Sequence, residues 1–369
     1  TDNEDCMFSQ WMWRCRDCLD CVYAFDSELC FECSDIRSCY NIKFSEHCEN
    51  CRNSSFLLDC RGCSDCYGCV GLERASFCFF NQQLSSEDYR CKLAEINLGS
   101  FKEYSSQQAN FQTFRSGFPL RHSYGRSNEN SSGNFLYNTK NCFDSYFVSN
   151  SQDTINCLGL DNAKSSILQA SYGDDSELVY LSTGIGDNAY NVKFSWECWC
   201  NVSDLEYCMY CTQGASNCFG CIGVRRASCC ILNKQYSERE YEELLPRVKA
   251  HMTANAEYGE FFPARFSPHA YNRSWAQQFL PLQAEECRIL GFRWHEQNEA
   301  CPRGEAELPD TAEEVRETDL EKVLRCSITG KPYRITKREL EYYQRNALPL
   351  PRQAPLERIK LKHKLFWLP

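Results

Sequence analysis

Small and apolar residues recur at every third position between residues 4 and 78, and charged or polar residues fill most of the intervening positions. In rows of eighteen residues, Cys15, Cys33, Cys51 and Cys69 form one column. A repeat this short buries its apolar face only by stacking on its neighbours. The spacing predicts a parallel β-helix with about eighteen residues per coil and about 4.8 Å between coils. The cysteines of this stretch all fall on multiples of three: Cys6, Cys15, Cys18, Cys21, Cys30, Cys33, Cys39, Cys48, Cys51, Cys60, Cys63, Cys66, Cys69 and Cys78.

The pattern occurs twice. Residues 26–48 match 175–198, and residues 66–96 match 218–248, which indicates two copies of one cassette. Each copy ends in a short apolar strand, at 77–80 and 229–232, followed by Asn-x-Gln and a capping-box sequence. These signals predict helices at about 86–97 and 238–252, placed to cover the last coil of each cassette. A further helix is predicted at 100–116.

We therefore predict a mainly β fold: a parallel β-helix solenoid in two duplicated cassettes with helical caps, and a small α/β C-terminal region. The segment 255–325 is predicted to hold a helix near 283–291 and a strand at 291–295. Cassette two has more coil before Asp175 than cassette one has before Asp26, which predicts that native sequence precedes Thr1. The predicted domains are 1–97 (cassette one), 98–133 (helix and linker), 134–254 (cassette two), 255–325 (connector) and 326–369 (basic module).

Twenty-eight cysteines allow three interpretations: disulfides, metal thiolates, or small buried packing residues. Comparison of the cassettes favours packing, because Cys30, Cys33 and Cys39 correspond to Val179, Ser182 and Ala189. Reduced cysteines indicate a reducing cytoplasm, and we expect no cofactor. If a metal binds, the densest sets would hold it: Cys60, Cys63, Cys66 and Cys69, or Cys208, Cys211, Cys218 and Cys221.

Three segments carry a resemblance to a known family: GCVGLERAS at 68–76 with its copy GCIGVRRAS at 220–228, NQQLS at 81–85 with NKQYS at 233–237, and GEFFP at 259–263. The chain resembles an uncharacterised cysteine-rich family of candidate-phyla (Patescibacteria-type) bacteria. The resemblance implies no particular activity. Members often begin with zinc-ribbon modules, which implies zinc in a segment before Thr1.

The C-terminal stretch 326–360 resembles such a treble-clef-like zinc ribbon. Cys326 matches the first ligand, but the other ligand positions hold Thr329, Ala354 and Glu357. A structural zinc site needs about four ligands, so we interpret the stretch as a metal-free descendant. The positions that keep the frame of the module are Gly330, Tyr342, Tyr343, Pro355 and Arg358.

The leading functional hypothesis is a non-enzymatic scaffold that binds a protein partner or a second copy of itself. An alternative is nucleic-acid binding through residues 331–364. This segment contains ten Lys and Arg but only three Glu, in a chain whose net charge is −10. The structural alternative is that this segment docks on the protein's own acidic body or is simply a solvated surface. The candidate contact residues are Arg334, Lys337, Arg338, Arg345, Arg352, Arg358, Lys360 and Lys362.

A second alternative is a polysaccharide-acting enzyme, since paired carboxylates can cleave glycosidic bonds. The candidates are Asp161, Asp174, Asp175 and Asp187, although their sequences are also typical of turns. No run of eighteen apolar residues is present, so we expect no membrane span.

Overall fold

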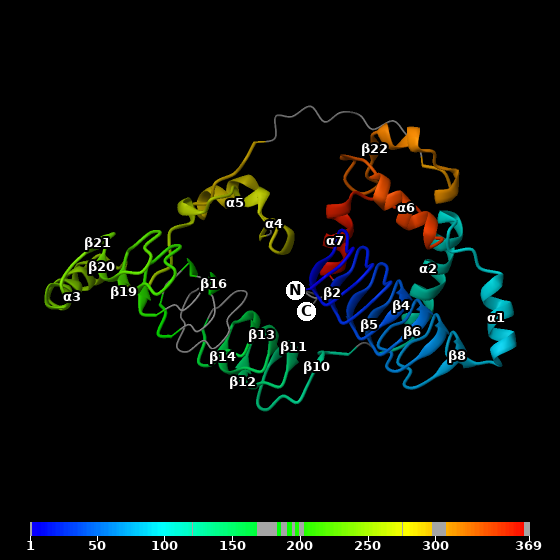
Figure 1. Ribbon diagram of the computed structural model, residues 1–369, viewed down its shortest axis with the longest axis horizontal. Coiled ribbons are helices and arrows are strands. Elements are labelled where there is room, and N and C mark those ends of the chain that lie inside the picture. The colour runs from blue at the N-terminus through cyan, green and yellow to red at the C-terminus, as the bar shows by residue number, and fades with distance from the viewer. Residues whose placement is uncertain are drawn as a thin grey trace. The chain divides into compact units, whose positions relative to one another are not determined.

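The computed structural model describes residues 2–119, 121–167, 183–185, 190–193, 196–198, 203–274, 276–296 and 308–364. Contacts divide the chain into two compact units. Unit 1 comprises Thr1–Pro119, Tyr271–Gln283 and Trp294–Pro369, and unit 2 comprises Leu120–Ala270 and Ala284–Arg293. Unit 1 therefore joins the first cassette to the C-terminal region, whose helices lie beside the N-terminal strands (Figure 1).

Parallel strands in unit 1 pair at a displacement of twelve residues. Gln10 pairs with Val22 and Tyr40 with Arg52. Residues twelve apart therefore stack on one another, and we call such a set a column. One sheet holds β1 (Gln10–Trp13), β2 (Val22–Phe25), β3 (Ser34–Arg37) and β5 (Glu46–Glu49); a second holds β4 (Tyr40–Lys43), β6 (Arg52–Ser55), β7 (Ser64–Tyr67), β8 (Ser76–Phe79) and an antiparallel β9 (Gln82–Gln83).

The backbone of this region turns at every third residue. Asp17, Asp20, Tyr23 and Asp26 all have positive φ, at 49°, 55°, 61° and 50°. A left-handed conformation costs a non-glycine residue roughly 1–2 kcal/mol, and Asp and Asn tolerate it best. A turn therefore falls inside each four-residue strand, as at Tyr23 in β2, and the chain runs straight for no more than three residues at a time. The cysteines on multiples of three are buried in the interior.

The predicted fold class is wrong. The strands fall into several small parallel and mixed sheets with helices beside them, and they do not form one clear parallel β-helix solenoid. The predicted period of eighteen is also wrong, because the paired strands are twelve residues apart. Cys15 therefore does not stack on Cys33. The chain cannot build one long sheet, because its backbone turns at every third residue.

Unit 2 is built from the same kind of short strand. Phe219 pairs with Ile231 at a displacement of twelve, whereas Leu205 pairs with Cys218 at thirteen. The last strand, β21, is antiparallel. The strands are β10 (Gly125–Arg126), β11 (Gly133–Tyr137), β12 (Lys140–Phe143), β13 (Ser145–Ser149), β14 (Gln152–Ile155), β15 (Leu158–Asp161), β16 (Thr183–Ile185), β17 (Trp196–Cys198), β18 (Leu205–Glu206), β19 (Ser216–Phe219), β20 (Ser228–Ile231) and β21 (Lys234–Gln235).

An asparagine side chain completes the last strand pairing in both units. Asn81 accepts a hydrogen bond from the Val70 amide at 2.8 Å and donates one to the Val70 carbonyl at 2.9 Å. Asn233 makes the same two bonds with Ile222, at 2.7 and 2.9 Å. The amide thus takes the place of a further strand and satisfies an edge that could otherwise recruit other chains. This is the structural role of the Asn-x-Gln motif.

The helices after each last strand are confirmed. They are α1 (Ser86–Ala94), α2 (Phe101–Arg115) and α3 (Glu238–Ala254). Ser85 and Ser237 cap α1 and α3 as the sequence predicted, and a reciprocal capping box is complete at α3. The short strands predicted at 77–80 and 229–232 are also confirmed as β8 and β20, each shifted by one residue.

The connector between the second cassette and the C-terminal module holds short helices: the 3-10 turns Ala264–Phe266 and Tyr271–Arg273, α4 (Ala276–Phe279) and α5 (Ala284–Ile289). The strand predicted at 291–295 is wrong, since the described chain has no strand there. The Phe292 amide donates to the Cys287 carbonyl and the Gly291 amide to Arg288, with Gly291 at φ 77°. This pattern closes a helix end rather than opening a strand.

The C-terminal module begins with the 3-10 turns Ala312–Glu314 and Glu317–Glu321. A two-stranded antiparallel pair follows, β22 (Leu324–Arg325) and β23 (Pro332–Tyr333), and then α6 (Lys337–Arg345) and α7 (Pro355–Lys364). The turn between the strands is closed by the Gly330 amide, which donates to the Cys326 carbonyl at 2.9 Å. Thr336 caps α6 with a complete capping box.

Candidate functional site

The cysteines fill the interior as thiols. Every cysteine whose side chain the structure describes is free, and most are buried. The thiols donate to backbone carbonyls: Cys33 Sγ lies 3.2 Å from the Phe31 oxygen and 3.5 Å from the Ile42 oxygen. Burial raises the pKa of Cys30 and Cys33. Because the thiolate is the nucleophile and the metal ligand, these groups are poorly suited to either role.

The two predicted metal sets are buried in the same way. Cys60, Cys63, Cys66 and Cys69 follow one another around the interior of unit 1, and each is at most 1% exposed. Cys208, Cys211, Cys218 and Cys221 do the same in unit 2. Their thiols donate to backbone carbonyls, as Cys60 does to Leu58 at 3.4 Å. Among the residues that the structure describes, no group of three or more His, Cys, Asp or Glu is placed to hold a metal ion.

The basic C-terminal module lies against acidic columns of unit 1. Arg338 pairs with Asp5. Arg345 pairs with Asp17, twelve residues further on, at 3.2 Å. The neighbouring column holds Asp20 and Glu32, which pair with Arg358 at 2.9 Å and Lys362 at 3.5 Å. The twelve-residue register therefore places acids on two adjacent columns, and basic side chains of α6 and α7 meet them.

Arg358 lies at the centre of this contact. Its side chain is 4% exposed and lies 2.9 Å from both Asp20 and Glu339, whose side chains are 0% and 1% exposed. Arg358 also donates to the Tyr343 hydroxyl at 2.5 Å and lies over the Phe8 ring. Burial raises the pKa of Asp20 to about 7, although the nearby guanidinium opposes the shift. The pKa of Glu339 is raised by the same cause.

The remaining candidate contact residues divide into two groups. Arg352 donates to the Pro309 carbonyl at 2.5 Å and stacks over Phe101, and Lys360 pairs with Glu357 at 2.7 Å. Arg334 and Lys337 are exposed. At least six of the eight predicted contact residues bind other residues of the chain, namely Arg338, Arg345, Arg352, Arg358, Lys360 and Lys362.

Of the acids that could have formed a glycan-cleaving pair, Asp174, Asp175 and Asp187 lie outside the described residues. Asp161 is exposed and accepts hydrogen bonds from Ser149 at 3.0 Å and Asn150 at 2.9 Å. Both donors lie in the preceding layer of the same unit. Asp161 therefore stabilises the turn at Ser149 and Asn150 through hydrogen bonds.

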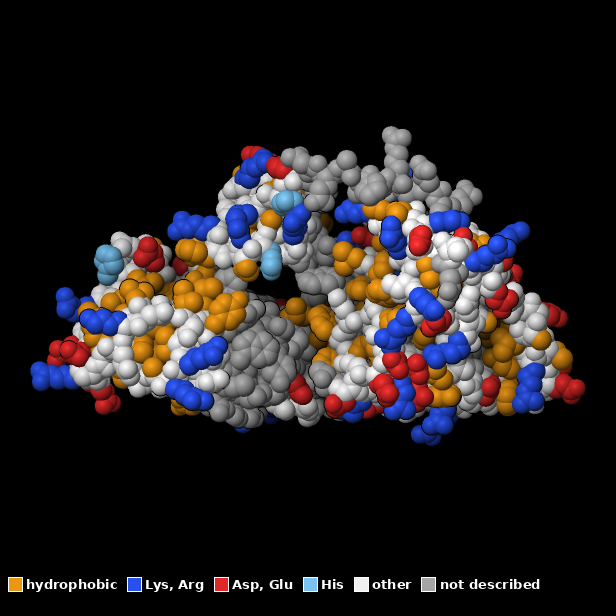
Figure 2. Space-filling model, turned by 45° about the horizontal axis from the view of Figure 1, so that its top comes forward, with side chains coloured by type: hydrophobic (Ala, Val, Ile, Leu, Met, Phe, Trp, Pro, Cys, Tyr) orange, Lys and Arg blue, Asp and Glu red, His pale blue; other side chains and the backbone are white. Residues whose placement is uncertain are grey.

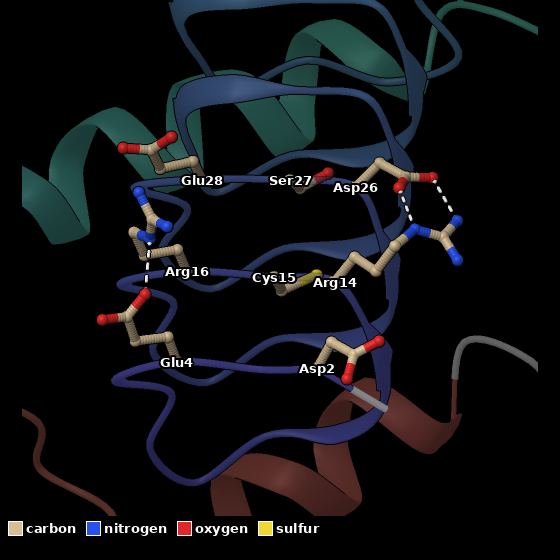
Figure 3. Close-up of a pocket in the computed structure, with 8 residues that line it drawn as sticks. All are labelled: Asp2, Glu4, Arg14, Cys15, Arg16, Asp26, Ser27 and Glu28. Atoms are coloured by element: carbon tan, nitrogen blue, oxygen red, sulfur yellow. Dashed lines mark hydrogen bonds and ion pairs between the residues drawn. The ribbon is translucent and has the colours of Figure 1, made fainter.

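A charged pocket of about 400 Å³ lies on the outside of unit 1, near its N-terminal end (Figure 3). Two columns flank buried Cys15 and Ser27. One consists of Asp2, Arg14 and Asp26, and the other of Glu4, Arg16 and Glu28.

Arginine stands in the middle of each column of this pocket. Arg14 makes a two-pronged contact with Asp26, at 2.5 and 2.9 Å. Arg16 reaches the other way, to Glu4, at 2.9 Å. All four of these side chains are well exposed. Sequence reasoning missed this pocket, although acid, arginine and acid spaced by twelve residues are visible in both columns once the register is known.

Comparison with known proteins assigns no family. No protein-family model and no curated protein matches the chain. One solved structure that it resembles is described as a "putative acetyltransferase from Desulfovibrio desulfuricans G20". That similarity has a TM-score of 0.14 and 8% identity, and it covers 61% of this chain and 60% of that one. A similarity this low carries no argument about fold or function.

None of the helices in the described part of the chain combines the length and the apolar composition needed to cross a bilayer.

Proposed function

We propose that the protein is a non-enzymatic scaffold of the reducing cytoplasm that binds a partner protein through side chains held in columns on its outer surface. The observation that carries this proposal is the charged pocket of unit 1. Its side chains are spaced by the twelve-residue register, and the pairs Arg14–Asp26 and Arg16–Glu4 orient each other. A surface ordered in this way loses little side-chain entropy when a partner binds.

The chemistry of the interior supports a binding role over a catalytic one. Cysteine is abundant in the sequence and is intrinsically nucleophilic as the thiolate, but burial raises the pKa of Cys30, Cys33 and Cys78. Raised thiol pKa values keep the thiolate scarce near neutral pH. Packing therefore accounts for the buried thiols of raised pKa. Cys63, Cys69, Cys211 and Cys221 differ, because hydrogen bonds from neighbouring thiols lower their pKa.

The basic module supports the same choice. Nucleic-acid binding needs exposed cations that can meet phosphates. Arg358 is buried, and Arg338 and Arg345 face carboxylates of unit 1. Binding to a phosphate backbone would have to compete with these internal pairs, so a protein partner is the better-supported proposal.

The pocket itself indicates the chemistry of that partner. It contains four carboxylates, from Asp2, Glu4, Asp26 and Glu28, and two guanidinium groups. Four negative and two positive charges leave a net charge of −2. Asp26 and Glu4 are occupied by arginines, whereas Asp2 and Glu28 take part in no ion pair within the described part of the chain. We therefore propose that the pocket accepts lysine or arginine side chains of a partner segment.

A fluorescent oligolysine peptide provides the direct test. We expect it to bind the full chain at low salt and Glu28→Gln to weaken that binding about two- to fivefold, as expected for one exposed ion pair. The matched control is Glu87→Gln, which removes the same charge from exposed α1. Equal weakening by both variants would show that the peptide responds only to net charge. Absence of peptide binding would contradict the proposed partner.

A further inference from the structure

An amphipathic helix covers the final layers of unit 1. Helix α2 packs Phe111 against Phe56, with ring centroids 5.7 Å apart, and Phe114 against Phe80 at 5.1 Å. Val70 lies one layer before Phe80, in the column next to that of Gly68 and Phe80; it is 6% exposed and belongs to the apolar cluster that contains Phe111. The second half of α2 therefore buries the corner of the cassette that Val70 and Phe80 form.

Unit 2 has the same corner. Ile222 corresponds to Val70 and Leu232 to Phe80 in the matched segments. The Asn81 bonds to Val70 are repeated by Asn233 and Ile222, as described above. A Cβ added at Gly68 would lie 2.9 Å from Phe80, and one added at Gly220 would lie 2.9 Å from Leu232.

Gly68 and Gly220 are therefore each covered closely by the side chain of the equivalent residue, Phe80 in unit 1 and Leu232 in unit 2. The two corners share their backbone geometry, their hydrogen bonds and their close approach. A helix that fits one has a matching surface on the other.

Unit 2 covers only part of this surface. Tyr207, which corresponds to Phe56, packs against Tyr258 at 6.3 Å and Phe262 at 5.9 Å. Below them, Glu206 pairs with Lys249 of α3 at 2.6 Å and accepts from the Tyr258 hydroxyl at 2.9 Å. The segment around Tyr258 thus covers Tyr207 as Tyr104 and Phe111 of α2 cover Phe56.

The corner that the second half of α2 buries in unit 1 is open in unit 2. Leu232 is 73% exposed and Ile222 is 59% exposed. Met209, which pairs with Ile222 in the same column, is half-buried. Helix α3 has no fully buried residue. Figure 2 shows hydrophobic side chains gathered over this part of unit 2. We call Met209, Ile222 and Leu232 the open corner.

Basic side chains flank the open corner. Arg225 and Arg226 follow Ile222 around the same layer, and Lys234 follows Leu232; all three are exposed. Within the described part of the chain, none of them takes part in an ion pair. Lys234 lies over the Tyr236 ring at 4.9 Å. A ligand that buries the corner therefore gains from carboxylates at its edge.

We propose that the open corner binds an amphipathic helix of a partner protein, with an apolar stripe placed like Phe111 and Phe114 and with acidic residues beside the stripe. A second copy of this chain is a poor occupant, because two such corners facing each other would bring their basic side chains together. This surface lies in unit 2 and does not depend on the charged pocket of unit 1.

The test uses α2 as a template. Three fluorescent peptides span residues 100–116: the native sequence, an acidic version with Gln108→Glu, Gln112→Glu and Arg115→Glu, and a basic version with lysine at the same three positions. The acidic peptide is expected to bind the full chain, the native peptide more weakly, and the basic peptide weakest. Leu232→Asp is expected to weaken the acidic peptide about tenfold or more, from the lost burial of one leucine.

Two controls make the result specific. Ile328→Asp also replaces an exposed aliphatic side chain by aspartate, but in unit 1, where Ile328 is 52% exposed, and it should leave binding within about twofold. Glu28→Gln, in the charged pocket, should also leave it unchanged, so failure of either proposal is visible by itself. The inference is overturned if the basic peptide binds as well as the acidic one, if Leu232→Asp has no effect, or if light scattering shows a dimer that Leu232→Asp dissociates.

Discussion

Removal of the Arg358 charge should detach the C-terminal module from the first cassette within unit 1. Arg358→Met keeps most of the side-chain volume but leaves the carboxylates of Asp20 and Glu339 buried without their cation. All three side chains are at most 4% exposed, so solvent screening does not reduce the effect. Loss of one partner of a buried ion pair costs about 3–5 kcal/mol. The opening equilibrium constant of the module should therefore rise by about two to nearly four orders of magnitude.

Hydrogen exchange followed by mass spectrometry gives a local measurement of this effect. Peptides that cover α6 and α7 should lose protection in Arg358→Met, whereas peptides that cover α3 in unit 2 should not change. Lys360→Met is the matched control, because Lys360 forms an i,i+3 pair with Glu357 and is partly exposed; a pair of this kind contributes about 0.2–0.5 kcal/mol. Unchanged protection of α7 in Arg358→Met would refute the assigned role of this cluster.

Two further results are expected. Burial raises the pKa of Asp20 to about 7. Below the pKa of the unfolded state, about 4, this carboxyl is protonated in both states and does not destabilise the fold; above it, folding must keep the proton bound or bury the charge, and stability falls. The docked module should therefore lose stability as pH rises from about 4 to about 7, by about 1.4 kcal/mol per pH unit. Hydrogen exchange of α7 across this range should show the slope, and Asp20→Asn should reduce it, leaving the part that comes from Glu339, whose pKa burial also raises; an unchanged slope in the variant would show that Asp20 does not contribute. Asn81→Ala and Asn233→Ala should each destabilise the last strand of their unit by about 2 kcal/mol, from two lost hydrogen bonds. Exchange of β8 and β20 measures this, and an equal effect from exposed Gln82→Ala would contradict the strand-capping role.

The sequence predicted the local elements better than the way they assemble. The capping sequences at Ser85 and Ser237 located α1 and α3, because a capping box is a local signal. The strands at the end of each cassette were located by their apolar character and by the Asn-x-Gln motif. These features depend on residues a few positions apart, which a single sequence displays directly.

The stacking period could not be read from the cysteines. Between residues 6 and 78, seven pairs of cysteines are twelve residues apart and seven are eighteen apart. Twelve and eighteen are both multiples of three, the spacing of the turns. The interior cysteine positions therefore fit either stacking period equally well. The exterior distinguishes them: acid, arginine and acid alternate at a spacing of twelve in Asp2, Arg14 and Asp26.

The docking of the basic module needed the three-dimensional register. The sequence shows a basic segment and an acidic body. Docking of one on the other is only one of the arrangements that this difference in charge allows. The pairs join residues more than three hundred positions apart, such as Arg345 and Asp17. Only after the twelve-residue displacement aligns Asp5 with Asp17, and Asp20 with Glu32, do the acids become two columns that a helix pair can meet.

Thiol counting combined with metal analysis tests the central claim most directly, namely that the cysteines pack the interior as free thiols and leave function to the outer surface. Purified protein that has not been treated with reductant should hold no stoichiometric zinc and should react rapidly at few thiols when folded, Cys91 among them because it is exposed. After denaturation it should titrate close to all 28 cysteines of the sequence. Stoichiometric metal, or a thiol count well below 28 that rises on reduction, would contradict the account.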